Sequence, residues 1–292
     1  MSGRFKKAPL VYVAARILIS QLPKLTEEQH ALLQQNLIRL GLTNRIEGKV
    51  QQFDFSPSDI EEGSMALTAS TTHRYGFFSS DKTNALILDG NYIEWRATTY
   101  TKYFGFIEKF EAALNELINT IDSLGFIEAK EFTLSYADVI APSANRDLKD
   151  YFQASESILP LSVINREKKE DSQSFGSIQS THVTSPNQKI TTTLEQLPVI
   201  ERQVRKFLPE ALAEPDHNFS MPIFLHDEWV NLDTKYYALL MTQAAMLQTV
   251  TLKELKPKEI FKDLHEVTKE TFKSLLNQNT CHTDWEFTEE QG

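Results

Sequence analysis

Residues 73–98 read HRYGFFSSDKTNALILDGNYIEWRAT, and the chain continues over 102–124 as KYFGFIEKFEAALNELINTIDSL. The first segment alternates apolar and polar residues around Asp89-Gly90, a strong hairpin signal, and predicts the end of a β-meander over 65–98. The second segment repeats apolar residues every three or four positions, which predicts a long amphipathic helix over 102–124. Alternation returns in IEAKEFTLSYADVI over 127–140, which predicts a strand. Antiparallel strands followed by a helix and a returning strand indicate an α+β protein.

Further local signals surround this stretch. A Val- and Ile-rich strand at 10–20, a helix at 27–40 with the capping box of Thr26 and Gln29, and a strand at 45–55 precede it. The segments that follow it are a hairpin over 175–193, a strand over 219–232 and a helix over 257–277.

Two sheet-and-helix units follow from this order of elements. We assign residues 1–160 to an N-terminal unit and 161–292 to a C-terminal unit, each an antiparallel sheet with a long helix. Because both units run from strands to a helix, they could be pseudo-symmetric, although no sequence repeat supports this. The polar segment 165–192 fits either a linker or an exposed hairpin, and its β-rich part favours the hairpin.

The composition is that of an ordinary globular protein, with 41% hydrophobic and 24% charged residues. The chain has 40 acidic and 30 basic residues, and its formal charge of −10 repels nucleic acid and anionic lipid. No apolar run reaches the roughly 20 residues that span a bilayer, so we expect no membrane contact. A single cysteine, Cys281, excludes an intramolecular disulfide and points to a reducing compartment, taken to be the cytoplasm.

The chain contains no familiar catalytic or cofactor-binding motif. It lacks GxGxxG, Walker, Gly-x-Ser-x-Gly and HExxH patterns, and 10 glycines are few for a phosphate-binding loop. Cys281 with His265 and His282 could suggest a Cys-His nucleophile, but the acidic residues that follow would raise the pKa of the thiol. We therefore assign no catalytic residue, no cofactor and no metal site.

Two polar clusters come closest to a site. His73 and Arg74 are consecutive strand residues that point to opposite faces, which predicts a surface arginine rather than a base beside an anion clamp. His226, Asp227 and Glu228 could supply metal ligands, but adjacent residues on a turn seldom all reach one ion. They remain the best candidates for an enzyme with an unfamiliar site.

Aromatic residues are a better functional lead, because aromatic anchors dominate the affinity of many protein interfaces. One group clusters where the meander meets the long helix, and a second begins the apolar stretch after residue 235. An ordinary core also accounts for them. The candidates for an interaction surface are Trp95, Tyr100, Tyr103, Phe104, Tyr236 and Tyr237.

One basic cluster keeps nucleic-acid binding open despite the acidic chain. Arg202, Arg205 and Lys206 would share one face if residues 195–207 formed a short helix. A solvated helix face explains the same pattern without a ligand.

Short motifs in a fixed order give the chain a family resemblance over nearly its whole length. They are Lys7–Val11, Arg74-Tyr75-Gly76-Phe77, Asn91-Tyr92-Ile93, Tyr100, Phe110, Asp147–Phe152, Leu232-Asp233, Leu264-His265, Phe272 and His282-Thr283-Asp284-Trp285. In these the chain resembles a sporadically distributed prokaryotic family for which no activity is established. The resemblance implies a cytoplasmic bacterial or archaeal protein. Patchy distribution is typical of mobile loci, so an antitoxin, sensor or scaffold of a phage-defence or toxin–antitoxin locus is the expectation.

The sequence therefore favours a non-enzymatic binding or regulatory protein that acts through protein–protein contacts. Its partner could be encoded in the same operon, and a homo-oligomer stays open. The alternatives are an enzyme with an unfamiliar site and a nucleic-acid-binding protein that uses the basic cluster.

Overall fold

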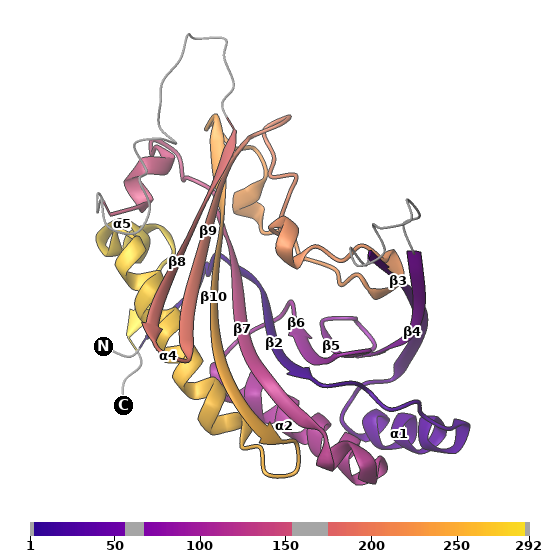
Figure 1. Cartoon of the computed structure of the whole chain (residues 1–292). Helices are drawn as coiled ribbons and strands as arrows, with labels where there is room; N and C mark the ends of the chain where they lie inside the picture. The colour runs from indigo at the N-terminus through magenta and orange to yellow at the C-terminus, as the bar shows by residue number, and fades with distance from the viewer. Residues whose placement is uncertain (1–2, 56–66, 154–174, 290–292) are drawn as a thin grey trace, which may run out of the picture.

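The computed structural model describes residues 3–55, 67–153 and 175–289, and their main feature is a nine-stranded antiparallel sheet (Figure 1). Its strand order is β3-β4-β5-β6-β2-β7-β10-β9-β8. The strands are β2 (Leu10–Ile19), β3 (Asn44–Phe55), β4 (Leu67–Phe78), β5 (Asn84–Asp89), β6 (Tyr92–Ala97), β7 (Glu128–Ile140), β8 (Gly176–Ser185), β9 (Gln188–Pro198) and β10 (Tyr236–Thr251). A separate two-stranded ribbon pairs β1 (Gly3–Phe5) with β11 (Phe287–Glu289). The predicted α+β class is confirmed.

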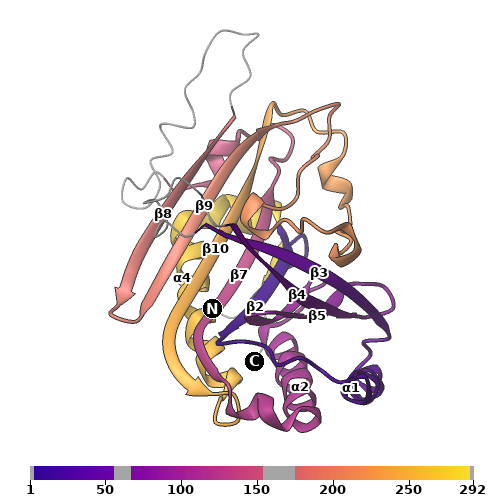
Figure 2. The same cartoon turned by 45° about the vertical axis from the view of Figure 1, so that its right-hand side comes forward.

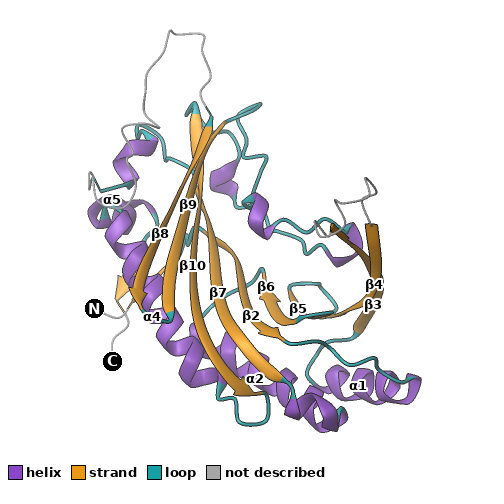
Figure 3. Ribbon diagram, in the orientation of Figure 1, coloured by secondary structure: helices purple, strands orange, loops and turns teal. Residues whose placement is uncertain are grey.

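The helices lie on the convex side of the curved sheet (Figure 3). They are α1 (Glu27–Arg39), α2 (Tyr103–Thr120), α4 (Pro257–Leu275) and the short α5 (Gln278–Asp284). The capping box of Thr26 and Gln29 forms as expected and starts α1. Phe110 of α2 and Phe261 of α4 lie edge to face, 5.7 Å between ring centroids, in the main core beneath the sheet. Local periodicity therefore located the long helices correctly.

Residues 199–235, here called the strap, cross the concave side of the sheet (Figure 2). The strap contains three short 3-10 helices, at Glu210–Leu212, His217–Phe219 and Asp227–Trp229, and no named strand. The predicted strand over 219–232 and the helix over 195–207 are therefore wrong. Val204 and Trp229 of the strap pack on Leu239 of β10, which explains the apolar residues that resembled a strand.

The long strand of the C-terminal half is β10, which pairs with β7 and β9. Its first eleven residues, 236–246, are mostly buried, so they lack the alternation that marks a half-buried strand. This is why the sequence indicated only a buried apolar stretch there.

The two halves share one continuous sheet across the β2–β7 pair. In each half the first strand pairs with the last strand of the following meander, β2 with β6 and β7 with β10, and a long helix comes next. The expected hairpin is present as β8 and β9, whereas residues 65–66 and 154–174 lie outside the described residues. This arrangement groups β7 with the C-terminal half, whereas the predicted division at residue 160 places it in the N-terminal unit, and that division stays a prediction.

Candidate functional site

The concave face of the sheet carries rows of residues in register that are mostly polar between β8 and β6. Residues directly opposite each other in paired strands point to the same face. One such row, read from β8 to β6, is Thr181, Thr191, Gln243, Ser135, Ala14 and Arg96. The β8 end of this row is neutral, and the β6 end belongs to a cluster of charges.

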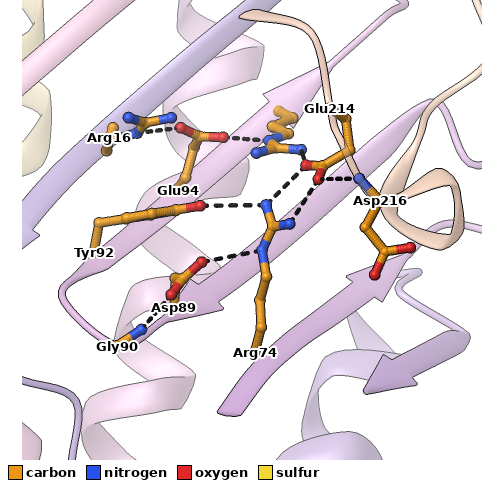
Figure 4. Close-up of polar contacts among 9 residues, drawn as sticks. Arg16, Arg74, Asp89, Gly90, Tyr92, Glu94, Glu214 and Asp216 are labelled. Carbon is orange, nitrogen blue, oxygen red and sulfur yellow. Dashed lines mark hydrogen bonds and ion pairs between the residues drawn. The ribbon is translucent and has the colours of Figure 1, made fainter. Parts of the chain in front are cut away.

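The charged half contains a buried ionic cluster, here called the arginine cluster (Figure 4). Glu94 of β6 accepts hydrogen bonds from Arg16 and Arg96. Burial would raise the pKa of the Glu94 carboxyl, but the two guanidinium groups outweigh it and lower that pKa. Arg74 of β4 forms an ion pair with Asp89 of β5, with 3.2 Å between Nε and Oδ2.

Glu214 brings one further carboxylate into the arginine cluster from the strap. It accepts hydrogen bonds from Arg74 Nη1 and Nη2 at 2.7 and 2.8 Å, and from Arg96 Nη1 at 2.7 Å. The backbone N–H of Asp216 donates a fourth hydrogen bond at 3.2 Å. Burial would raise the pKa of Glu214, but the arginines lower it to about 2. Glu214 therefore stays ionised and links the strap to the sheet.

Phe219 holds the strap beside the arginine cluster by fitting against two glycines. A Cβ atom on Gly48 would lie 2.8 Å from Phe219 Cε2, and one on Gly76 would lie 3.0 Å from Phe219 Cδ1. The guanidinium carbon of Arg74 lies 4.5 Å from the centroid of the Phe219 ring. The strap therefore needs glycine at these strand positions.

Sequence reasoning missed the arginine cluster. His73 and Arg74 do point to opposite faces, but Arg74 is buried, so the predicted surface arginine is wrong. Glu94 and Arg96 lie two residues apart in a strand of otherwise apolar, buried neighbours, and this spacing places opposite charges on one face. That spacing could have indicated a buried ion pair in β6, but it does not reveal Glu214, which is 118 residues from Arg96.

The half of the concave face nearer β8 contains a groove of about 510 Å³. Thr181 and Thr191 share a hydrogen bond of 3.0 Å, and Gln243 donates one of 3.0 Å to Ser135. The groove is lined by Glu131, Ser177, Gln179, Thr181, Lys189, Thr191, Thr193, Glu195, Met241 and Gln243 from the sheet, and by Pro209, Glu210 and Ala211 from the strap. We call it the polar groove.

The polar groove extends to β8, one of the two edge strands of the sheet. The ten residues of β8, GSIQSTHVTS, include no Lys, Arg, Asp, Glu or Pro. Val183 in β8 is 65% exposed, and Phe175, which directly precedes β8, is 77% exposed. The opposite edge strand, β3, carries Arg45, Glu47 and Lys49. Only one of the two edges therefore has the charges that usually prevent edge-to-edge pairing.

The proposed interaction aromatics are mostly interior. Trp95, Tyr103 and Tyr237 are buried, so an exposed surface made of them is wrong. Tyr103 stacks on His265 of α4 at 4.3 Å between ring centroids, and the Tyr237 hydroxyl bonds to the backbone of Lys206. These rings hold helix and strap against the sheet. Tyr100 and Tyr236 are half-buried and Phe104 is 67% exposed, and their role in contacts stays a prediction.

The basic cluster does not form a helix face, because residues 201–208 are a turn and an extended segment of the strap. Arg202 pairs with Asp233 at 2.5 Å, and Arg205 pairs with Glu201. Lys206 pairs with Glu195 at 2.7 Å. Each cation of the predicted nucleic-acid face is therefore neutralised by an acid, which removes the field that a phosphate backbone needs.

His226 and Glu228 line a smaller cavity of about 250 Å³, together with Lys7, Tyr151 and Asp284. The ring of His226 lies 4.4 Å from that of Trp229, and Glu228 lies 3.6 Å from the ammonium of Lys7. Asp227 is absent from this lining, so the three adjacent residues do not act together. Among the described residues, no three His, Cys, Asp or Glu side chains are placed to hold one metal ion.

Cys281 is buried, and burial raises the pKa of its thiol to about 12, which keeps it protonated.

No protein-family model, curated protein or solved structure matches the chain. Across the residues that the structure describes, no helix is long and apolar enough to cross a membrane.

Proposed function

We propose that this protein is a non-enzymatic binding protein whose partner adds an extended strand to β8. One observation carries the proposal: β8 is a ten-residue edge strand without charge or proline, the two devices that most often keep sheet edges from pairing. In strand addition the backbone groups of the edge supply the affinity, and alternate side chains supply the specificity.

The side chains around β8 indicate what the partner strand contains. On the concave side it would lie beside Gln179, Thr181 and Val183, next to the polar groove. Phe175 and Val183 offer exposed apolar contacts at the two ends of β8. We therefore expect an extended partner segment with polar residues at its centre and apolar residues near its ends.

The family resemblance supports the biological setting of this proposal. It favours a cytoplasmic prokaryotic protein whose partner is encoded in the same operon, with the chain acting as antitoxin, sensor or scaffold of a defence or toxin–antitoxin locus. The pseudo-symmetric arrangement of two sheet-and-helix units belongs to the same proposal. It is supported by the shared order of strand, meander and helix in the two halves.

Co-expression with the products of the neighbouring genes tests the proposal. The wild-type chain should co-purify with one of them, and Val183→Lys should abolish the complex, because a lysine on the edge strand opposes pairing. Glu47→Gln makes the same change of one positive charge on β3 and should leave the complex intact. A complex that survives both Val183→Lys and Gln179→Lys would rule out strand addition at β8.

The oligomeric state of the purified chain gives a second outcome. A homodimer that Val183→Lys converts to a monomer would mean that a second copy supplies the added strand. A wild-type chain that remains monomeric and binds no operon product would contradict the proposed function.

The cavity beside His226 and Glu228 keeps an enzyme as the second candidate function. Its lining places a histidine, a lysine, a tyrosine hydroxyl and carboxylates around one space. Screening small-molecule hydrolysis with the wild-type chain and with His226→Ala tests it. Activity that is unchanged in the variant would remove this candidate.

A further inference from the structure

The arginine cluster is electrically balanced only when the strap takes part. The sheet itself contributes three guanidinium groups and two carboxylates, which leaves one positive charge. Its members are Arg16, Arg74, Arg96, Asp89 and Glu94. Arg74 and Arg96 are buried and pair with Asp89 and Glu94, whereas the side chain of Arg16 is 42% exposed, so water partly screens the surplus charge. The carboxylate of Glu214 supplies the missing negative charge.

The donors around Glu214 form a binding site for an oxyanion. Three guanidinium N–H groups of Arg74 and Arg96 converge on its two oxygens at 2.7 to 2.8 Å, whereas the fourth donor, the backbone N–H of Asp216, belongs to the same loop as Glu214. Arg74 contacts both oxygens, which is the forked geometry that arginine uses for carboxylates and phosphates. Any group with two or more anionic oxygens matches this arrangement.

The sheet holds these arginines in place independently of Glu214. Arg96 is bonded to Glu94 in the same strand. Arg74 is fixed by Asp89 and by a 3.2 Å hydrogen bond to the hydroxyl of Tyr92, both in the sheet, and it also contacts the ring of Phe219 in the strap. The site is therefore preformed, and Glu214 is its occupant rather than its scaffold.

Glu214 enters the site from an exposed loop. Its neighbours Ala213, Pro215 and His217 are exposed, whereas Phe219 anchors the strap five residues later. Only the loop between the 3-10 helices at 210–212 and 217–219 needs to move for the side chain to leave. The buried part of the strap would keep its contacts with the sheet.

We propose that Arg74 and Arg96 form an oxyanion-binding site that Glu214 occupies as an internal ligand, so that an external carboxylate or phosphate group binds by displacing it. Pro209, Glu210 and Ala211, which line the polar groove, directly precede this loop. The inference does not depend on the binding mode of β8.

The test is chemical rescue of the full chain carrying Glu214→Ala. Removing the internal carboxylate should lower the melting temperature, and inorganic phosphate or acetate should restore it with a saturable dependence. Sodium chloride at matched ionic strength should restore much less. The wild-type chain should respond to the oxyanions only at higher concentrations than Glu214→Ala, because Glu214 competes for the site. Comparison of phosphate with acetate determines which oxyanion the site prefers.

Two further variants keep the test decisive. Glu210→Ala removes the same charge from an exposed strap position and should show no oxyanion-specific rescue. If Glu214→Ala does not fold, Glu214→Gln keeps the volume of the side chain, and phosphate should raise its melting temperature. The proposal is overturned if the folded Glu214 variant responds to phosphate, acetate and chloride alike.

Discussion

The two halves of the concave face use polar side chains in opposite ways. Around Arg96, full charges are buried beneath the strap and neutralise one another. Around Thr191, hydroxyl and amide groups lie beside four charged side chains in a groove that reaches an uncharged edge strand; the charged residues are Glu131, Lys189, Glu195 and Glu210. Charged groups are costly to bury and need close partners, whereas hydroxyl groups tolerate exchange with water or a ligand. We therefore assign the stabilising role to the charged half and propose the half that holds the polar groove for binding.

The largest difference between the halves should appear when one cation is removed. Arg96→Ala leaves the carboxylates of Glu94 and Glu214 buried with fewer partners, which should lower the free energy of unfolding by about 3–5 kcal/mol. Thr193→Val removes one hydroxyl group from the polar groove and should change the free energy of unfolding by less than about 1 kcal/mol. Urea denaturation of both variants measures these values. Equal effects would contradict the assignment of the two roles.

Acid should weaken the charged half selectively. The pKa of Glu214 is lowered from 4.5 to about 2, so its stabilising contribution is complete above pH 4.5 and is lost as the pH falls towards 2. This shift corresponds to about 3 kcal/mol. Urea unfolding between pH 7 and pH 3 should show a smaller loss of stability for Glu214→Gln than for the wild type. Parallel curves would contradict the role of Glu214.

Glycine substitutions give a smaller contrast. A Cβ on Gly76 would lie 2.6 Å from Phe78 Cε2 and 3.0 Å from Phe219 Cδ1, so Gly76→Ala should cost about 1–3 kcal/mol. Gly176 in β8 has nothing within 4 Å of such a Cβ, and Gly176→Ala should be neutral or stabilise by up to about 1 kcal/mol. Thermal unfolding of the two variants checks this. A destabilised Gly176→Ala would mean that β8 is covered.

The smallest effect on stability is expected at the edge itself. Val183→Lys places a charge on an exposed side chain and should change the free energy of unfolding by less than about 0.5 kcal/mol. The same variant should nevertheless lose the partner, because edge pairing is what the charge opposes. Denaturation and co-purification of one preparation separate the two effects. A large loss of stability would instead assign Val183 to the fold.

The sequence predicted those parts of the fold that depend on local periodicity. Three signals each depend only on residues that are close in the sequence, and the elements that they predict formed as expected. They are the hairpin signal of Asp89-Gly90, the capping box at Thr26 and the apolar stripe of α2. β10 was not predicted as a strand and the strap was misassigned, because a strand buried on both faces and a strap anchored by scattered apolar residues have no characteristic period.

The arginine cluster could not be predicted from local sequence patterns, for a different reason. Arg74 and Glu214 are 140 residues apart, and nothing near either residue indicates that they meet. The aromatic residues chosen for an interface, such as Trp95, were correctly recognised as a cluster but lie in the core. The uncharged character of β8 was readable from its ten residues, but its meaning depends on its place at the edge of the sheet.

Hydrogen–deuterium exchange of the two edge strands, with and without a partner identified by co-expression, tests the central claim most directly. Strand addition predicts that amides of β8 gain strong protection in the complex while those of β3 remain unchanged. Unchanged exchange in β8 upon formation of a stable complex would contradict the account.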